Sequence, residues 1–368
     1  MGLKDQWRRW RNQMIASPRF QAFAADFPLT RPVARARSKA LFDLIAGFTY
    51  SQTLAACLDL GLFERLSQEP ASLEILAQEL EFEPKNLERL LKAAVSLDLL
   101  EKSSSGAYDL GIHGAALRGN PYIAGFIRHH GLLYRDLHEP VDLLRGQGQT
   151  ALSQYWAYAG EGENSPAART QVADYTTLMA ASQKAVAREI LALHDFSDAR
   201  HLIDIGGSNG TFIAAAAARY PNLQFTLFDL PAVTEIAQET FEKHGISGRA
   251  TISPGSFLTD DLPKGADIAT LIRVLHDHDD DSALTILTAA RRVLPKGRRL
   301  ILAEPLSGTP DTASISDAYF GLYFAAMGQG KTRTPAEIAE IGRLAGFSKI
   351  SSPKSRMPLL TSVLVLEH

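Results

Sequence analysis

Short apolar runs alternate with longer amphipathic segments from residue 201 to the end of the chain. The apolar runs have the length of strands, and helical patterns separate most of them. They lie near residues 201–206, 223–228, 250–253, 267–273, 298–303, 348–352 and 360–366. This alternation predicts an α/β domain with a doubly wound, mainly parallel, Rossmann-like sheet, whose ligands bind outside the carboxyl ends of the strands.

The first part of the chain has helical patterns instead. Residues 41–60 are apolar enough to predict one buried helix. Ser72 can cap a helix over residues 73–80, and Pro84 can open the next helix. A short hairpin is expected to turn at residues 104–106. This order of elements is typical of a winged-helix domain.

A winged-helix domain can bind DNA or another protein chain. Residues 71–102 carry four basic and seven acidic side chains, a net charge of −3 that would repel phosphates. We therefore expect this domain to serve dimerisation, and we expect no nucleic acid as a partner.

The turn after the first strand of the sheet is rich in glycine. Residues 204–210 read DIGGSNG, and Gly206 and Gly207 begin the turn. Glycine leaves the backbone bare, so a ligand can lie against it. Asp229 ends the second strand, where a carboxylate can accept both hydroxyls of a ribose. The pattern predicts a site for an adenine nucleoside.

Two cofactors contain such a nucleoside. The dinucleotide pattern G-x-G-x-x-G is absent, and Asp204, directly before the turn, would repel a pyrophosphate. The same carboxylate suits a ligand with an ammonium and a sulfonium group. We therefore expect S-adenosyl-L-methionine rather than NAD, and a glycine turn without any ligand is the remaining alternative.

Polar residues follow the ends of several strands and should converge on one edge of the sheet: Asp204, Asp229, Ser256, His276 and Glu304. His276 can act as a general base, because free imidazole titrates near neutral pH. Glu304 can hold the imidazole in the useful tautomer. His276 could instead cap the next helix or, together with His278, Asp277 and Asp279, bind a metal. We expect no metal, because the neighbouring acids suit a helix N-terminus.

Charge is unevenly spread along the chain. Residues 1–40 hold nine basic and two acidic side chains, so this arm has a net charge of +7 and the remainder has −10. Trp7, Trp10 and Met14 fall on one helical face among arginines. Such a segment can lie on an anionic membrane surface or pack on a partner subunit with its arginines in solvent.

The remaining composition indicates a soluble globular protein, with 45% hydrophobic and 21% charged residues. We expect no membrane span, because the apolar runs are too short for one, and the first residues have no apolar core like that of a signal peptide. Cys57 is the only cysteine, which excludes an internal disulfide and a cysteine-built metal site. A cytoplasmic setting is expected.

Several segments resemble the small-molecule O-methyltransferases of the caffeate and hydroxyindole type: DIGGSNG, FDLPAV, VLHDHDD, LILAEP and GQGKTRTPAEIAEIGRLAGF. The resemblance covers nearly the whole chain. It implies a class I methyltransferase fold, S-adenosylmethionine as cofactor and a homodimer. The segments HHGLLYRDLHEPVDLLRG, ALSQYWAYAG and SDAYFGLYFAAMGQGKTRT are most similar to the branch that acts on carotenoids, which implies methylation of the tertiary hydroxyl of a hydroxycarotenoid.

The resemblance also implies roles for single residues. It assigns the turn at Gly206 to the cofactor, Asp229 with the adjoining Leu230 to the ribose, His276 to the base, and Glu304 to one of two carboxylates beside that base. The second carboxylate falls at Thr332, where many relatives have glutamate, so a two-acid clamp is in doubt. Ser256 and Phe257 fall where relatives contact the adenine.

Four apolar residues at helical spacing can line a long pocket for such a substrate: Phe320, Tyr323, Phe324 and Met327. They can also belong to an ordinary core or to a dimer interface. Phenolic or polyketide hydroxyls are alternative acceptors, and a catalytically inactive winged-helix regulator is a more distant alternative.

The length of 368 residues predicts more than one domain. A surface loop is expected around residues 146–168 and a long helix over 170–195. Peripheral contact with the inner or photosynthetic membrane through the arm is one alternative, and packing of the arm on a partner subunit is the other. We divide the chain into the arm (1–40), a winged-helix dimerisation domain (41–112), a helical connector and substrate-pocket region (113–195) and an S-adenosylmethionine-binding catalytic domain (196–368).

Overall fold

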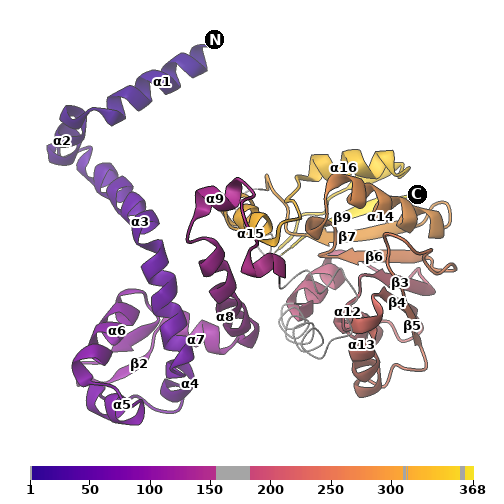
Figure 1. The fold of residues 1–368 in the computed structure, drawn as a ribbon, viewed down its shortest axis with the longest axis horizontal. Helices are drawn as coiled ribbons and strands as arrows, with labels where there is room; N and C mark the ends of the chain where they lie inside the picture. The colour runs from indigo at the N-terminus through magenta and orange to yellow at the C-terminus, as the bar shows by residue number, and fades with distance from the viewer. Residues whose placement is uncertain (1, 155–182, 310–311, 313, 357–360) are drawn as a thin grey trace. The chain divides into compact units, whose positions relative to one another are not determined.

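The computed structural model describes residues 2–154, 183–309, 312, 314–356 and 361–368. The chain forms two compact units, Met1–Ala124 and Gly125–His368 (Figure 1). The predicted loop at 146–168 and helix at 170–195 lie partly outside the described residues. At their edges, residues 151–154 and 183–193 are helical.

The N-terminal unit has the predicted winged-helix order. The Ser72 hydroxyl accepts the Ile75 N–H at 3.4 Å, and Pro84 is the first residue of the next helix. The final hairpin pairs Leu100 with Leu110. Its elements are α1 (Leu3–Ala16), α2 (Pro18–Asp26), α3 (Arg31–Asp59), α4 (Leu62–Leu66), α5 (Leu73–Glu79), α6 (Pro84–Ser96), β1 (Leu100–Lys102), β2 (Tyr108–Leu110) and α7 (Ile112–Arg118).

The predicted burial of the helix over residues 41–60 is wrong for its first half. Helix α3 begins ten residues earlier, at Arg31, and its first fully buried residue is Cys57. Leu44 is 81% exposed and Phe48 is 66% exposed in the single chain. By length and composition α3 could also cross a membrane, with a mean hydropathy of 1.2 in its most apolar window. A helix whose apolar face is covered by another chain passes the same test.

The C-terminal unit contains the predicted sheet. Its strands lie in the order β5-β4-β3-β6-β7-β9-β8, and β9 is antiparallel to both of its neighbours. The strands are β3 (His201–Ile205), β4 (Gln224–Asp229), β5 (Ala250–Pro254), β6 (Ile268–Ile272), β7 (Arg299–Glu304), β8 (Lys349–Ser351) and β9 (Ser362–Glu367).

Helices cover both faces of this sheet (Figure 1). α12 (Thr211–Arg219) and α13 (Pro231–Lys243) pack on one face, and α14 (Asp280–Val293) and α16 (Pro335–Leu344) pack on the other. Successive strand residues point to opposite faces: Leu202 joins the α12–α13 core, whereas Ile203 joins the α14–α16 core. Burial of both faces explains why the strands are continuously apolar.

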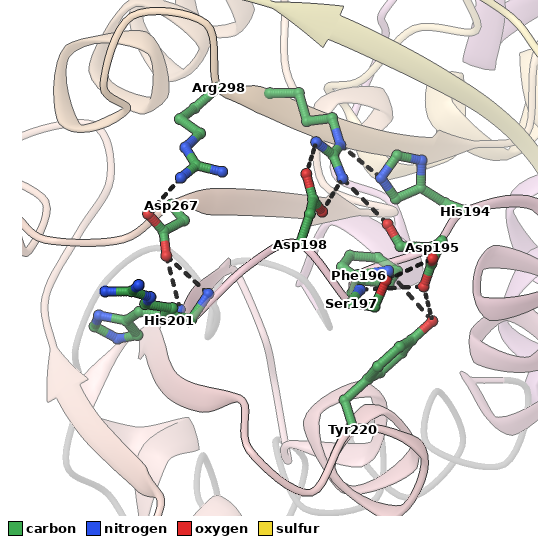
Figure 2. Close-up of polar contacts among 11 residues, drawn as sticks. His194, Asp195, Phe196, Ser197, Asp198, His201, Tyr220, Asp267 and Arg298 are labelled. Atoms are coloured by element: carbon green, nitrogen blue, oxygen red, sulfur yellow. Dashed lines mark hydrogen bonds and ion pairs between the residues drawn. The ribbon is translucent and has the colours of Figure 1, made fainter.

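A polar network joins the amino ends of the strands (Figure 2). Arg299, at the start of β7, donates to both carboxylate oxygens of Asp198 at 2.8 and 2.6 Å and to Nε2 of His194 at 2.7 Å. Asp267 accepts the N–H of His201, the first residue of β3, at 3.2 Å. These side chains lie at the amino ends of the strands, so they fix the entry of the chain into the sheet.

Three further helices belong to the same unit. α8 (Pro121–Asp136), whose first turn lies in the other unit, and α9 (Pro140–Leu144) precede the sheet in the sequence, and α15 (Phe320–Met327) lies between β7 and β8. Nε2 of His129 lies 2.8 Å from the Tyr323 hydroxyl, and Nε2 of His130 lies 2.8 Å from the Tyr319 hydroxyl. These two bonds tie α8 to α15 and to the π-helical turn before it, Ser314–Tyr319.

Candidate active site

The sheet order brings the predicted polar residues to one edge. β4, β3, β6 and β7 are consecutive neighbours, and the first three are parallel to β7. Asp229 therefore lies at the end of β4, Asp204 near the end of β3, His276 just beyond β6 and Glu304 at the end of β7. Ser256 follows β5, the strand next to β4.

The glycine turn touches the segment that carries His276. Gly206 has a φ of +71°, and a Cβ there would lie 2.6 Å from Cγ2 of Val274, two residues before His276. A Cβ on Gly207 would lie 2.9 Å from Oδ2 of Asp204. Any larger side chain would therefore push the turn away from both the histidine segment and the carboxylate.

Asp229 is fixed by backbone donors on either side. Its Oδ2 accepts the Ser208 N–H at 2.7 Å, and its Oδ1 accepts the Leu230 N–H at 2.7 Å. Burial raises the pKa of Asp229 to about 6, although both hydrogen bonds act to lower it. The carboxylate is thus held rigidly at the mouth of the turn, with lone pairs left to accept further hydrogen bonds.

Asp204 is almost fully buried, and its Oδ1 accepts the Thr270 hydroxyl at 2.6 Å. Burial, with a smaller contribution from the charge of Asp229, raises the pKa of Asp204 to about 7. Two carboxylates that both resist ionisation lie at this turn. Such a pair suits a ligand that brings a positive charge and hydroxyl donors.

Ser256 and Phe257 lie on the other side of the turn. The Ser256 N–H donates to Oδ2 of Asp260 at 2.8 Å, and the Ser256 hydroxyl accepts the Leu258 N–H at 3.3 Å. The ring of Phe257 would lie 3.7 Å from a Cβ on Gly206 and packs edge-on against His278, with centroids 5.4 Å apart. Phe257 is therefore an apolar wall beside the glycine turn.

His276 is held between two carboxylates. It lies in a single 3-10 turn, Leu275–Asp277, and its Nδ1 bonds to Oε2 of Glu304. Its Nε2 lies 3.2 Å from Oδ1 of Asp277. The second oxygen of Glu304 accepts the N–H groups of Val274 and Leu275 at 3.0 and 2.8 Å. Glu304 therefore fixes both the imidazole ring and the backbone that carries it.

The two carboxylates control the proton affinity of the imidazole. Burial lowers the pKa of His276, but the charges and hydrogen bonds of Asp277 and Glu304 outweigh it and raise the pKa to about 10. The site thus contains an imidazole with an unusually high affinity for a proton. Positive charge added to the site would lower this pKa.

Sequence reasoning missed two residues of this arrangement. It sought the second carboxylate at Thr332, but the acid nearest to Nε2 is Asp277, which had been considered only as a metal ligand. It also missed Arg333, which is 2% exposed and bonds to the turn that carries His276. The sequence offered one signal for each: Asp277 directly follows His276 in VLHDHDD, and Arg333 directly follows Thr332 in GKTRT.

The neighbouring acids have other partners. Asp279 caps α14 by accepting the Ser282 N–H at 2.8 Å, as its position before a helix predicts. Asp280 accepts from Lys331 at 2.9 Å and from Nε of Arg333 at 2.8 Å. Within the described ranges, these carboxylates do not gather into a cluster that could hold a metal.

The four predicted pocket residues lie on α15 beside this site. Phe324 is 4% exposed, and its ring lies 5.4 Å from the ring of His276. Phe320 stacks on Phe324 with centroids 5.7 Å apart. Tyr323 and Met327 are buried with them in an apolar cluster that also contains Leu133, Leu143 and Leu152. Phe324 is the member of the four with a ring contact to His276.

The sequence is similar to known families and proteins. Residues 134–348 match the O-methyltransferase domain, and residues 42–114 match the O-methyltransferase dimerisation domain. The chain is 37% identical to demethylspheroidene O-methyltransferase of Cereibacter sphaeroides, over 96% of this chain and 93% of that protein. It is also 37% identical to the enzyme of that name from Rhodobacter capsulatus, over 97% and 88%.

More distant relatives and solved structures have the same fold. Acetylserotonin O-methyltransferase of Gallus gallus is 26% identical, over 84% of this chain and 92% of that protein. The structure of human N-acetylserotonin methyltransferase in complex with SAM superposes with a TM-score of 0.74 at 23% identity, covering 90% of this chain and 97% of that one. The SAH-bound form of CalO1 superposes with a TM-score of 0.76 at 24% identity, covering 90% and 98%.

The predicted class I methyltransferase fold, with an N-terminal dimerisation domain, is therefore confirmed. The preference for S-adenosylmethionine over NAD is confirmed as well, because the family uses that cofactor. The chain belongs to the S-adenosylmethionine-dependent O-methyltransferase family.

Proposed function

We propose that the protein methylates the tertiary hydroxyl of a hydroxycarotenoid, with His276 as general base. The observation that supports this proposal is the close packing of Gly206, in the glycine turn, on Val274, two residues before His276. Glycine turn, imidazole and aromatic helix thus adjoin one another in a single unit of the chain.

The residues at the turn fit the expected cofactor. Asp229 would accept the ribose hydroxyls, with Leu230 beside it, and Ser256 and Phe257 would face the adenine. Asp204, Gly206 and Gly207 would adjoin the amino-acid part, because a buried carboxylate with a raised pKa is stabilised by a cationic partner. When bound, S-adenosylmethionine supplies an electrophilic methyl group and a positive charge.

His276 then has the task of removing the hydroxyl proton. Nε2 takes this proton as the acceptor oxygen gains the methyl group, and Glu304 holds Nδ1 and stabilises the resulting imidazolium. Nε2, which lies 3.2 Å from Oδ1 of Asp277, is the ring nitrogen left for the acceptor hydroxyl, because Nδ1 bonds to Glu304. A tertiary alcohol is a very weak acid, so a base of high proton affinity and close alignment suits it.

The acceptor class is supported by sequence similarity and by the apolar helix. The relatives with 37% identity are both named for demethylspheroidene, whereas a 3-hydroxy-5-methyl-1-naphthoate 3-O-methyltransferase of Streptomyces sahachiroi is 27% identical. Phe324, with Phe320, Tyr323 and Met327 around it, would present an apolar surface to a polyene chain. A phenolic or polyketide acceptor is the alternative.

The basic arm acquires a role under the same proposal, because a carotenoid is dissolved in the bilayer. Helix α1 has no buried residue, and Trp7 and Trp10 are 59% and 55% exposed. The guanidinium of Arg11 lies over the ring of Trp7 at 5.3 Å. The arm would lie on an anionic membrane surface with its tryptophans at the interface. The matches to the demethylspheroidene enzymes cover 96% and 97% of the chain, too much to omit the whole arm.

A product assay tests the acceptor directly. The protein is incubated with isotope-labelled S-adenosylmethionine and a panel of hydroxycarotenoids and phenols, and products are identified by mass. We expect a labelled methyl ether of a hydroxycarotenoid bearing a tertiary hydroxyl. Label found only in phenolic products would overturn the proposed acceptor and leave the methyltransferase assignment intact.

A further inference from the structure

The turn that carries His276 is held from two sides. On one side, Glu304 accepts the N–H groups of Val274 and Leu275. On the other side, the segment 330–333 bonds to the carbonyl groups of the turn. The N–H of Lys331 donates to the His276 carbonyl at 2.8 Å.

Arg333 completes this second side. Its Nη1 donates to the Leu275 carbonyl at 2.8 Å, and its Nη2 donates to the His278 carbonyl at 2.8 Å. Its Nε donates to Asp280 at 2.8 Å, which fixes the plane of the guanidinium against the start of α14. The carbonyl groups on both sides of His276 in the sequence are thus bonded to one rigid side chain.

Burial of the charged Arg333 side chain costs free energy, which its hydrogen bonds must offset. The Arg333 side chain is 1% exposed, while that of Asp280, its carboxylate partner, is 53% exposed. A buried cation with a largely solvated partner depends on its carbonyl acceptors for compensation. The planar fork of arginine matches several fixed acceptors at once, which the single ammonium of lysine does not.

We infer that Arg333 is a positioning residue for His276, acting through the carbonyl groups of Leu275 and His278 rather than through contact with either substrate. This inference rests on the proposed role of His276 as base. Loss of the guanidinium removes its two hydrogen bonds to the turn and leaves only the Lys331 N–H on that side, while Glu304 still holds the imidazole. The ring would then be displaced relative to the acceptor, and displacements of about 1 Å cost on the order of 100-fold in rate.

Arg249 offers a matched control in the same unit. Its guanidinium also bonds to backbone carbonyl groups, those of Ala217, Tyr220 and Leu223, but it lies before β5, at the opposite edge of the sheet. Arg249→Met removes hydrogen bonds of the same kind, from a guanidinium to backbone carbonyl groups, and should lower the unfolding temperature without altering the His276 turn. A merely structural role for Arg333 would give both variants the same kinetics.

The test compares Arg333→Met, Arg333→Lys and Arg249→Met in the full-length protein. Titration calorimetry gives the Kd of S-adenosylhomocysteine, and steady-state assays give kcat with the acceptor identified by the product assay. For Arg333→Met we expect an unchanged Kd and a kcat lower by about 100-fold. Arg333→Lys should recover part of kcat, and Arg249→Met should retain both values.

The double variant His276→Ala/Arg333→Met separates this inference from the function it depends on. If Arg333 acts through His276, the double variant is no slower than His276→Ala alone. A full kcat in Arg333→Met, while His276→Ala is inactive, would overturn the positioning role only. Retained turnover in His276→Ala would instead overturn the base. A weakened Kd in Arg333→Met, equal in size to the loss of kcat, would contradict positioning as well.

Discussion

The two carboxylates that hold His276 differ in burial. The side chain of Glu304 is 2% exposed, whereas that of Asp277 is 19% exposed. Glu304 also bonds to two backbone N–H groups and cannot leave without freeing the turn. Under the proposed mechanism, Asp277 is therefore the carboxylate that moves aside for an acceptor at Nε2, while its charge continues to raise the proton affinity of the ring.

This division of roles predicts the effect of Asp277→Asn on the pH profile. The base must be uncharged, and the pKa of His276 lies above its ordinary value, so kcat/KM should rise with pH on the alkaline side of neutrality. Removal of one negative charge lowers the pKa of His276 and should move the rising limb to lower pH by about one unit. The measurement is kcat/KM for the acceptor at saturating S-adenosylmethionine.

Asp281 provides the control for this change, because it is exposed in the first turn of α14. Asp281→Asn should leave the profile where it is. A profile of Asp277→Asn that coincides with that of the wild type would exclude Asp277 from the electrostatics of the base.

Asp229→Ala tests the ribose assignment. The variant removes a carboxylate that two backbone donors hold at the turn. The Kd of S-adenosylhomocysteine should therefore rise by at least about 100-fold, because two hydrogen bonds to a charged group contribute about 3 kcal/mol or more. Calorimetry measures the affinity, with the exposed Asp261→Ala as control. Equal affinity in the two variants would refute the assignment.

For single residues, the sequence predicts the location of those that directly follow the end of a strand. Asp204, Asp229, His276 and Glu304 were found because strands of one parallel sheet end at one edge. Arg333 was not found, because it acts on carbonyl groups, and no residue pattern reveals which carbonyl groups a side chain will reach. Asp277 was seen but assigned to a different chemistry.

Among the elements, the strands of the sheet and the helices and hairpin of the winged-helix domain were predictable from local patterns of apolar residues, caps and turns. The burial of α3 was not. Its residues from Leu41 to Phe48 are apolar except for Asp43, which predicts burial, yet several of them are exposed in one chain. Apolar periodicity shows that a face will be covered and does not show whether the same chain covers it.

Helix α1 carries the prediction for membrane contact. Trp7→Ala/Trp10→Ala should weaken binding to vesicles that contain anionic lipid, because both exposed rings would enter the interface. Co-sedimentation with such vesicles measures the change, and neutral vesicles should bind the wild type more weakly. The control is Phe82→Ala, an exposed aromatic outside the arm. Wild-type protein that fails to sediment with anionic vesicles would refute the role of the arm.

For the whole molecule, the exposed face of α3 agrees with the match of residues 42–114 to a dimerisation domain. A second copy of the chain is the partner that this domain implies. Leu44→Glu/Phe48→Glu places charges on that face and should convert a dimer to a monomer, because buried unpaired charges are costly at an interface. Light scattering on a sizing column measures the mass.

Leu144→Glu is the control for this prediction. Leu144 is 64% exposed but lies on α9, outside the dimerisation domain. This variant should remain a dimer. A dimer that survives Leu44→Glu/Phe48→Glu would show that another surface joins the two copies.

The most direct test of the account is His276→Ala, assayed for cofactor binding and turnover on the same preparation. His276 does not belong to the cofactor turn, so the variant should bind S-adenosylhomocysteine with wild-type affinity. Its kcat should fall by about 10²–10⁴-fold, the usual contribution of a general base. The exposed His244→Ala should retain both properties. Turnover of His276→Ala at the wild-type rate would contradict the central claim.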